Sequence, residues 1–184
     1  WIDRLIELGN IARQQSDYDK ALKCYREALE IYRAHGHREG LGEAHRGLGH
    51  AYSHQARLDE ALEHYQLALD IHRECGNRRL EGLALGNLGH LFWALGKFDE
   101  ALENYQLALE ISREVGNKRG EAIALGNLGD ALFAGERFDE AKAALQDAIS
   151  VLEEAGIVPA AGAFRGSLAW LLASQGQGEE AHRK

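Results

Sequence analysis

Histidine is the residue type in this chain with the most obvious capacity for chemistry. There are nine histidines, and His50-Ala-Tyr-Ser-His54 places two of them on one helical face, four residues apart. His90 and Asp130 are expected further along the same strip. A transition metal needs several such ligands converging at about 2 Å, whereas neighbouring helices pack about 10 Å apart, and no glutamate base follows in the metalloprotease pattern. We therefore expect no metal site.

The sequence also lacks the other common catalytic arrangements. Its glycines fall within and at the ends of predicted helices, so that none forms a phosphate-binding loop. The acidic pair Asp59-Glu60 recurs at the same place in later repeats, where capping and solvation of a helix account for it. Serines without a recognisable nucleophile context are Ser53, Ser112, Ser150, Ser167 and Ser174. We expect a protein that is not an enzyme and that uses no cofactor.

Composition indicates a soluble, folded protein. Hydrophobic residues make up 45% and charged residues 27% of the 184 residues. The net charge of −8 argues against nucleic acid as a partner, because nucleic-acid binding rests on neutralising phosphates. No apolar run approaches the ~20 residues of a membrane span. Cys24 and Cys75 lie in different repeats without metal-type spacing, as expected of free thiols in the cytoplasm.

A Leu-Gly pair at residues 88–89 recurs at 8–9, 48–49 and 128–129, and Leu168-Ala169 is a weaker fifth copy. The period is 40 residues throughout, and residues 41–80 and 81–120 are identical at twenty-one of forty positions. A constant period of this size predicts stacked structural units rather than one globular core. We predict a single domain over residues 1–184 with repeats at about 1–40, 41–80, 81–120 and 121–160 and a truncated fifth at 161–184.

Each repeat reads as two helices of about 15–18 residues. In the third repeat one apolar stripe runs from Leu85 to Leu95 and a second from Ala101 to Ile111, with a tight turn at residues 96–99. Gly89 is expected to face Ala101 where the two helices cross. The second helix begins near an aspartate, at 19, 59, 99 and 139, and is followed by a glycine suited to a left-handed cap, at 36, 76, 116 and 156.

The pattern Leu85-x-x-Leu88-Gly89-x-x-Phe92, followed by Ala101-x-x-x-Tyr105-x-x-Ala108, resembles the tetratricopeptide repeat over the whole chain. That repeat usually has 34 residues and ends in proline, a position held here by Arg33, Arg73, Arg113 and Glu153. The longer unit is similar to the 40-residue repeats of Pins/LGN-type polarity adaptors and of bacterial regulators. The resemblance implies an all-α, right-handed superhelical solenoid whose first helices line a concave groove.

Family register places a set of variable residues in that groove. The expected peptide-contacting positions are Asn10, Arg13, Arg46, His50, Asn87, His90, Trp93, Asn127, Asp130, Phe133 and Trp170. Packing positions recur in every copy, whereas these positions differ, which makes them the better functional candidates. The N-terminal part is polar and the C-terminal part aromatic. The alternative is that the aromatic side chains pack against neighbouring helices and meet no ligand.

Two functions from different classes are consistent with this pattern. The first is a scaffold or adaptor that binds a protein or peptide in the groove. The second is a sensing domain that controls a kinase, NTPase or transcription regulator elsewhere in a larger bacterial signalling protein. The chain reads as a segment of a longer protein that ends as a further helix begins, which would expose Leu168, Leu171 and Leu172. Uncapped ends of this kind predict self-association in concentrated samples.

Overall fold

Helices occupy nearly all of the chain in the computed structural model, which describes the backbone of residues 2–182 and the side chains of residues 4–157 and 159–174. Within these residues there are nine α-helices and no strand. Helices α2 to α8 have 17 residues each, in agreement with the predicted length. The bounds are α1 Ile2–Gln14, α2 Tyr18–Ala34, α3 Arg38–His54, α4 Leu58–Glu74, α5 Arg78–Ala94, α6 Phe98–Glu114, α7 Lys118–Ala134, α8 Phe138–Glu154 and α9 Val158–His182.

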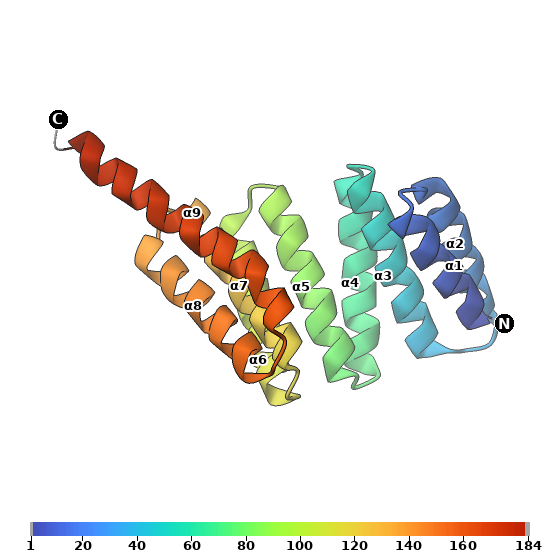
Figure 1. Cartoon of the computed structure of the whole chain (residues 1–184). Helices are drawn as coiled ribbons and strands as arrows, with labels where there is room; N and C mark the ends of the chain where they lie inside the picture. Colours follow the sequence, from blue (N-terminus) through green and yellow to red (C-terminus); the bar gives the residue numbers. More distant parts are fainter. Residues whose placement is uncertain (1, 183–184) are drawn as a thin grey trace.

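Successive helices pack as helix–turn–helix units, and the units stack side by side along the molecule (Figure 1). Odd-numbered helices also contact one another between units, in two groups: α1 packs against α3, and α7 packs against both α5 and α9, whereas α3 and α5 make at most marginal contact. We call these five odd-numbered helices the inner row. The predicted fold class, an all-α superhelical solenoid, is confirmed.

Glycine caps end the second helix of each unit as predicted. The chain then turns back, and the N–H of His37, for example, donates to the carbonyl oxygen of Tyr32 at 3.0 Å. The next helix begins at an N-cap: the Asn77 side chain accepts from the N–H of Leu80 at 3.2 Å. The capping glycines have φ of +65°, +67°, +67° and +71°, at Gly36, Gly76, Gly116 and Gly156.

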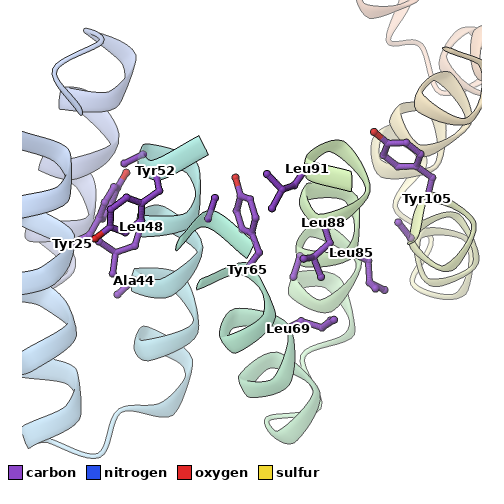
Figure 2. Packing of buried hydrophobic residues seen from close by; sticks show 14 of the residues in the cluster. Tyr25, Ala44, Leu48, Tyr52, Tyr65, Leu69, Leu85, Leu88, Leu91 and Tyr105 are labelled. Atoms are coloured by element: carbon purple, nitrogen blue, oxygen red, sulfur yellow. The ribbon is translucent and has the colours of Figure 1, made fainter. Parts of the chain in front are cut away.

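The apolar stripes of successive units merge into an extended core (Figure 2). Leu85 and Leu88 are 2% and 1% exposed. The closest contact at Gly89 is with Tyr105: an added Cβ would lie 2.7 Å from Cδ1 of this ring, one turn beyond the expected partner Ala101 on α6. The glycine is needed because the buried tyrosine ring fills the space that a side chain on α5 would occupy. At the equivalent Gly129 an added Cβ would also lie 3.3 Å from the carbonyl oxygen of the predicted partner, Ala141.

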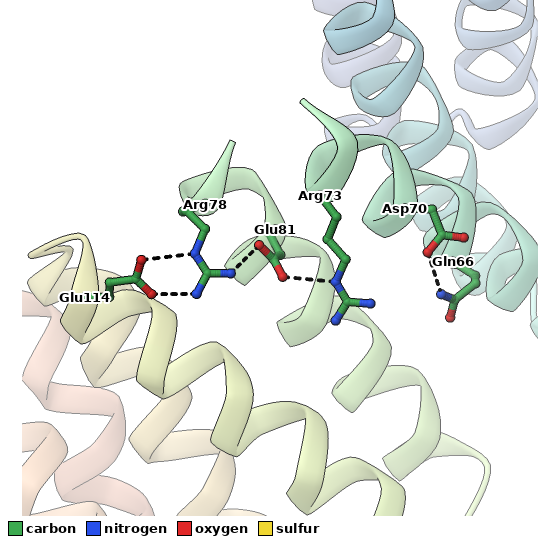
Figure 3. Close-up of polar contacts among 6 residues, drawn as sticks. All are labelled: Gln66, Asp70, Arg73, Arg78, Glu81 and Glu114. Carbon is green, nitrogen blue, oxygen red and sulfur yellow. Dashed lines mark hydrogen bonds and ion pairs between the residues drawn. The ribbon is translucent and has the colours of Figure 1, made fainter. Parts of the chain in front are cut away.

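Buried glutamates join consecutive units. Glu81, 6% exposed, accepts from Nε of Arg73 at 3.0 Å and from Arg78 at 2.5 Å, and Arg78 also pairs with Glu114 (Figure 3). Arg73 occupies the position at which a shorter repeat has proline. Because helix α4 continues past this position, its arginine reaches the first turn of α5. Charge pairing thus replaces the proline stop, and the next junction repeats the arrangement through Glu121, Arg113 and Lys118.

Helix α9 differs from the prediction in two respects. It is one continuous helix of 25 residues, where we expected a further helix to begin near the end of the chain. Leu171 is 1% exposed because it packs with Leu132 and Leu145, and Leu168 is half-buried beside them. Only Leu172, 44% exposed, fits the expectation of an exposed leucine here. Self-association through the ends remains a prediction.

Candidate functional site

Three hollows follow one another along α5, α7 and α9 of the inner row. Their volumes are about 200 Å³ between α5 and α7, about 90 Å³ in the middle, and about 440 Å³ between α7 and α9. His90 and Asn127 line both the first and the middle hollow, and Trp93 and Asp130 line both the middle and the third. The hollows therefore form one groove, which contains the predicted residues Asn87, His90, Trp93, Asn127, Asp130, Phe133 and Trp170.

The α5–α7 hollow combines amide side chains with an apolar mouth. Asn87 and Asn127 stand on its two walls, and each can both donate and accept hydrogen bonds. The rim carries Leu83, Val115 and Ile123, which are 42%, 39% and 45% exposed. Sequence reasoning missed these three residues. The available signal was an apolar residue at 83 and 123, one repeat apart and outside the buried stripes.

The α5–α7 hollow is open because the residue across it from Gly86 is the small Ala124. An atom added at Gly86 would meet nothing within 4 Å, and Ala124 lies across the same hollow. One repeat later, Gly126 has the register of Gly86 and Phe164 has the register of Ala124. There the Phe164 ring lies directly against Gly126, so that any Cβ would collide with it. The equivalent space between α7 and α9 is therefore filled.

The third hollow is walled by aromatic rings. Phe133 and Trp170 lie with ring centroids 4.5 Å apart at 57°, and Trp93 stands opposite them on α5. Trp93 is 41% exposed and Trp170 is 63% exposed, so that both indoles present large apolar surfaces to solvent. That these aromatic side chains contact a ligand, and do not only pack against neighbouring helices, remains a prediction.

Carboxylate chemistry in the groove centres on Asp130. Burial raises the pKa of Asp130, and a hydrogen bond from the Ser167 hydroxyl lowers it by a smaller amount. The pKa of Tyr105 in the middle hollow is also raised, first by burial and then by the nearby charge of Asp130. His90 does not bond Tyr105 among the described contacts; its ring stacks at 6.2 Å and 20° on Trp93. Asp130 is the acidic residue of the C-terminal half of the groove.

The structure places the predicted residues of the N-terminal half elsewhere. Asn10 accepts a hydrogen bond from the Tyr25 hydroxyl at 2.8 Å, and His50 is 3.1 Å from the Tyr65 hydroxyl. Both therefore satisfy buried tyrosines within their own units. The sequence feature that could have predicted these hydrogen bonds is a tyrosine fifteen residues after Asn10 and after His50. In the fourth unit the corresponding position holds Leu145.

Arg13 and Arg46 lie close to His50, on the N-terminal side of the groove. Burial, together with the charges of Arg46 and Arg13, lowers the pKa of His50 to about 3. Arg46 pairs with Glu43 at 2.5 Å. Arg13 has a buried Nε without a hydrogen-bond partner among the described residues. These residues form a polar cluster that is separate from the three hollows.

The described residues contain no group of three or more His, Cys, Asp or Glu side chains placed to hold a metal ion. Cys24, half-buried, and Cys75, exposed, are free thiols. Over the part of the chain that the structure describes, no helix has the length and apolar character needed to cross a membrane.

Comparison with family models identifies the class of protein that this fold and groove define. The model described as tetratricopeptide repeat matches residues 3–74 and 80–154. The chain belongs to the tetratricopeptide repeat family, whose fold is typically a non-catalytic interaction scaffold. Comparison with curated protein sequences gave no match.

Solved structures share the fold at low sequence identity. BtubC from P. vanneervenii aligns with a TM-score of 0.71 and 24% identity over 95% of this chain and 81% of that protein. Aspartyl phosphate phosphatase F from Bacillus subtilis aligns with a TM-score of 0.83 and 18% identity over 95% of this chain and 46% of that one. A Signal Transduction ATPase with Numerous Domains from Pyrococcus horikoshii, which has a tetratricopeptide repeat sensor, aligns with a TM-score of 0.75 and 19% identity. The alignment covers 89% of this chain and 26% of that protein.

Proposed function

We propose that residues 1–184 form one repeat domain that acts as a cytoplasmic scaffold and binds a peptide segment of a partner protein in the groove along α5, α7 and α9. The observation that carries this proposal is the continuous line of three hollows, which contains seven of the variable positions predicted from register. Its solvent-exposed apolar side chains Leu83, Trp93, Ile123 and Trp170 all project from the inner row.

The hollows differ enough in chemistry to orient a peptide. The α5–α7 hollow offers two asparagine amides, which can bond the peptide backbone, beneath an apolar rim. The α7–α9 hollow offers aromatic walls and a carboxylate. A bound segment would place its backbone polar groups near Asn87 and Asn127 and one larger side chain between Trp93 and Trp170.

A regulatory role is the second candidate, supported by the names of the solved structures that share the fold. Two of the similar structures are named as a phosphatase and as a signalling ATPase with a repeat sensor, and this chain covers 46% and 26% of them. The 40-residue length of the unit is similar to that of the repeats of such regulators and of Pins/LGN-type adaptors. In this case the same groove binds an effector peptide and the response occurs in an attached domain.

Selection from a random peptide library on the immobilised chain tests groove binding. Replacing both groove amides (Asn87→Ala with Asn127→Ala) should weaken selected ligands at least about tenfold, because two amides that bond the peptide are lost. Gln146→Ala on the outer helix α8 is the matched control and should leave binding unchanged. Ligands that bind the wild type and the double variant equally would place recognition outside the groove.

A further inference from the structure

The α7–α9 hollow has the walls of a cation-binding site. Three aromatic residues, Trp93 on α5, Phe133 on α7 and Trp170 on α9, surround a volume of about 440 Å³. The faces of aromatic rings carry negative electrostatic potential and attract ammonium and guanidinium groups, tryptophan most strongly. Three helices of three different units supply these rings, so that the arrangement exists only in the stacked array.

The charge in the hollow points the same way. Asp130 is the only charged side chain among the described residues that line it, and Asp130 forms no ion pair with them. The other polar group of the lining, Ser167, is a neutral hydroxyl. A carboxylate beside apolar walls repels anions, and an uncharged apolar guest would cover it with only the Ser167 hydroxyl as a hydrogen-bond partner and no opposite charge.

We propose that this hollow binds the side chain of an arginine in the partner peptide, with the guanidinium stacked on an indole and donating hydrogen bonds to the Asp130 carboxylate. This assignment rests on the proposed peptide-binding function and names the chemistry of its partner. Arginine is preferred over lysine because its planar guanidinium can stack on a ring and donate to a carboxylate with two N–H groups at once.

Small blocked amino acids test the cation site without any need for a selected peptide. N-acetyl-arginine methylamide and its neutral isostere N-acetyl-citrulline methylamide are titrated into the protein while the indole N–H resonances of Trp93 and Trp170 are followed by NMR. Variants Trp93→Phe and Trp170→Phe assign the two signals. We expect saturable shifts of both resonances with the arginine probe, at a dissociation constant about tenfold lower than with citrulline.

Asp130→Asn should remove the preference for arginine over citrulline, and Asp147→Asn on the outer helix α8 should retain it. Circular dichroism on each variant establishes that the helices are intact. Equal binding of the two probes, absence of saturable binding of arginine, or an arginine preference that survives in a folded Asp130→Asn variant would overturn the cation site. None of these results bears on the asparagine-dependent peptide binding, which is tested separately.

Discussion

The ring of Phe164 on α9 lies against the backbone of Gly126 on α7, so that no side chain can be accommodated at this glycine. Gly86, at the same register on α5, has open space at the corresponding point. Two glycines with identical sequence context, Leu-Gly-Asn-Leu-Gly, therefore have different reasons to be present. Gly126 allows Phe164 of the next unit to pack against α7, whereas Gly86 borders the α5–α7 hollow.

Alanine substitution should separate the two roles. Gly126→Ala should lower the free energy of unfolding by about 1–3 kcal/mol, because the new methyl group displaces the Phe164 ring. Gly86→Ala should raise it by up to about 1 kcal/mol, because alanine is the better helix former and the methyl group meets nothing. Urea unfolding of the two variants measures both effects, and equal effects in the two would contradict the assignment.

The core histidine His72 should be replaceable with a gain in stability. His72 is fully buried, both of its ring nitrogens lack a hydrogen-bond partner among the described residues, and it lies over Gly42. The equivalent residue in the fourth unit is Leu152, which is 1% exposed. Leucine at 72 removes a buried N–H without a partner, so His72→Leu should stabilise the protein by about 1–2 kcal/mol.

Thermal and urea unfolding at pH 7 measure this gain. His35→Leu, at an exposed site, is the control and should give no stabilisation. A loss of stability in the His72→Leu variant would show that the imidazole has a partner that the structure does not reveal.

Much of the fold could be predicted because packing imposes a strict register. The capping glycines, the two helices per unit and the buried stripe of Leu85 and Leu88 all follow from residues that recur every 40 positions. The partner of Gly89 could not be predicted as readily. Ala101 and Tyr105 lie on the same face of α6, one turn apart, and a repeat pattern does not distinguish which of them needs the space.

The groove was predictable only in part, because variability has more than one cause. Asn10 and His50 occupy a position that differs between repeats, but each is hydrogen-bonded to the hydroxyl group of a buried tyrosine, Tyr25 or Tyr65. Asp130 has no such duty, since position 145 is leucine, and it remains available to the groove. Distinguishing these cases requires knowing which side chain faces which, and that depends on the crossing of helices from different units.

Acidification should destabilise the second unit. The His45 and His64 Nδ1 atoms lie 2.9 Å apart, and one of them must accept, so that the contact cannot hold two protons. Burial, together with the charges of His64 and Arg33, lowers the pKa of His45 from 6.5 to about 4. The pKa of His64 is lowered by burial and by Arg26, while Glu63 and Glu60 act in the opposite direction.

Since the folded pKa of His45 lies below the unfolded value, the unfolded chain binds the proton first. The contribution of His45 to stability is complete above pH 6.5 and is lost as the pH falls toward about 4. For this residue we expect a loss of about 2 kcal/mol between pH 7 and pH 5. Urea unfolding over this range should show a shallower pH dependence for His45→Leu than for wild type. The same slope in both would contradict the prediction, and His35→Gln at an exposed site is the control.

The arginine at the position where a 34-residue repeat has proline should contribute to stability only where it reaches a buried glutamate. Arg73 bonds Glu81, whose side chain is 7% exposed, whereas Arg33 pairs with Glu30, whose side chain is 69% exposed. Arg73→Ala removes one of two charged partners from a buried carboxylate and should cost about 1–2 kcal/mol. Arg33→Ala should cost less than about 0.5 kcal/mol. Thermal unfolding compares the two, and similar losses would argue against the junction role of Glu81.

Phenylalanine at position 124 should close the α5–α7 hollow in the way that Phe164 closes the equivalent space between α7 and α9. The chain itself shows that the architecture accepts this ring beside a glycine, so Ala124→Phe should change the free energy of unfolding by no more than about 1 kcal/mol. Peptides that use Asn87 and Asn127 should lose binding, because the ring occupies the space between these amides. Ala143→Phe, which adds the same ring on the outer helix α8, should leave peptide affinity unchanged. Isothermal titration with a selected peptide distinguishes the variants, and full affinity in a folded Ala124→Phe protein would exclude the α5–α7 hollow from the binding site.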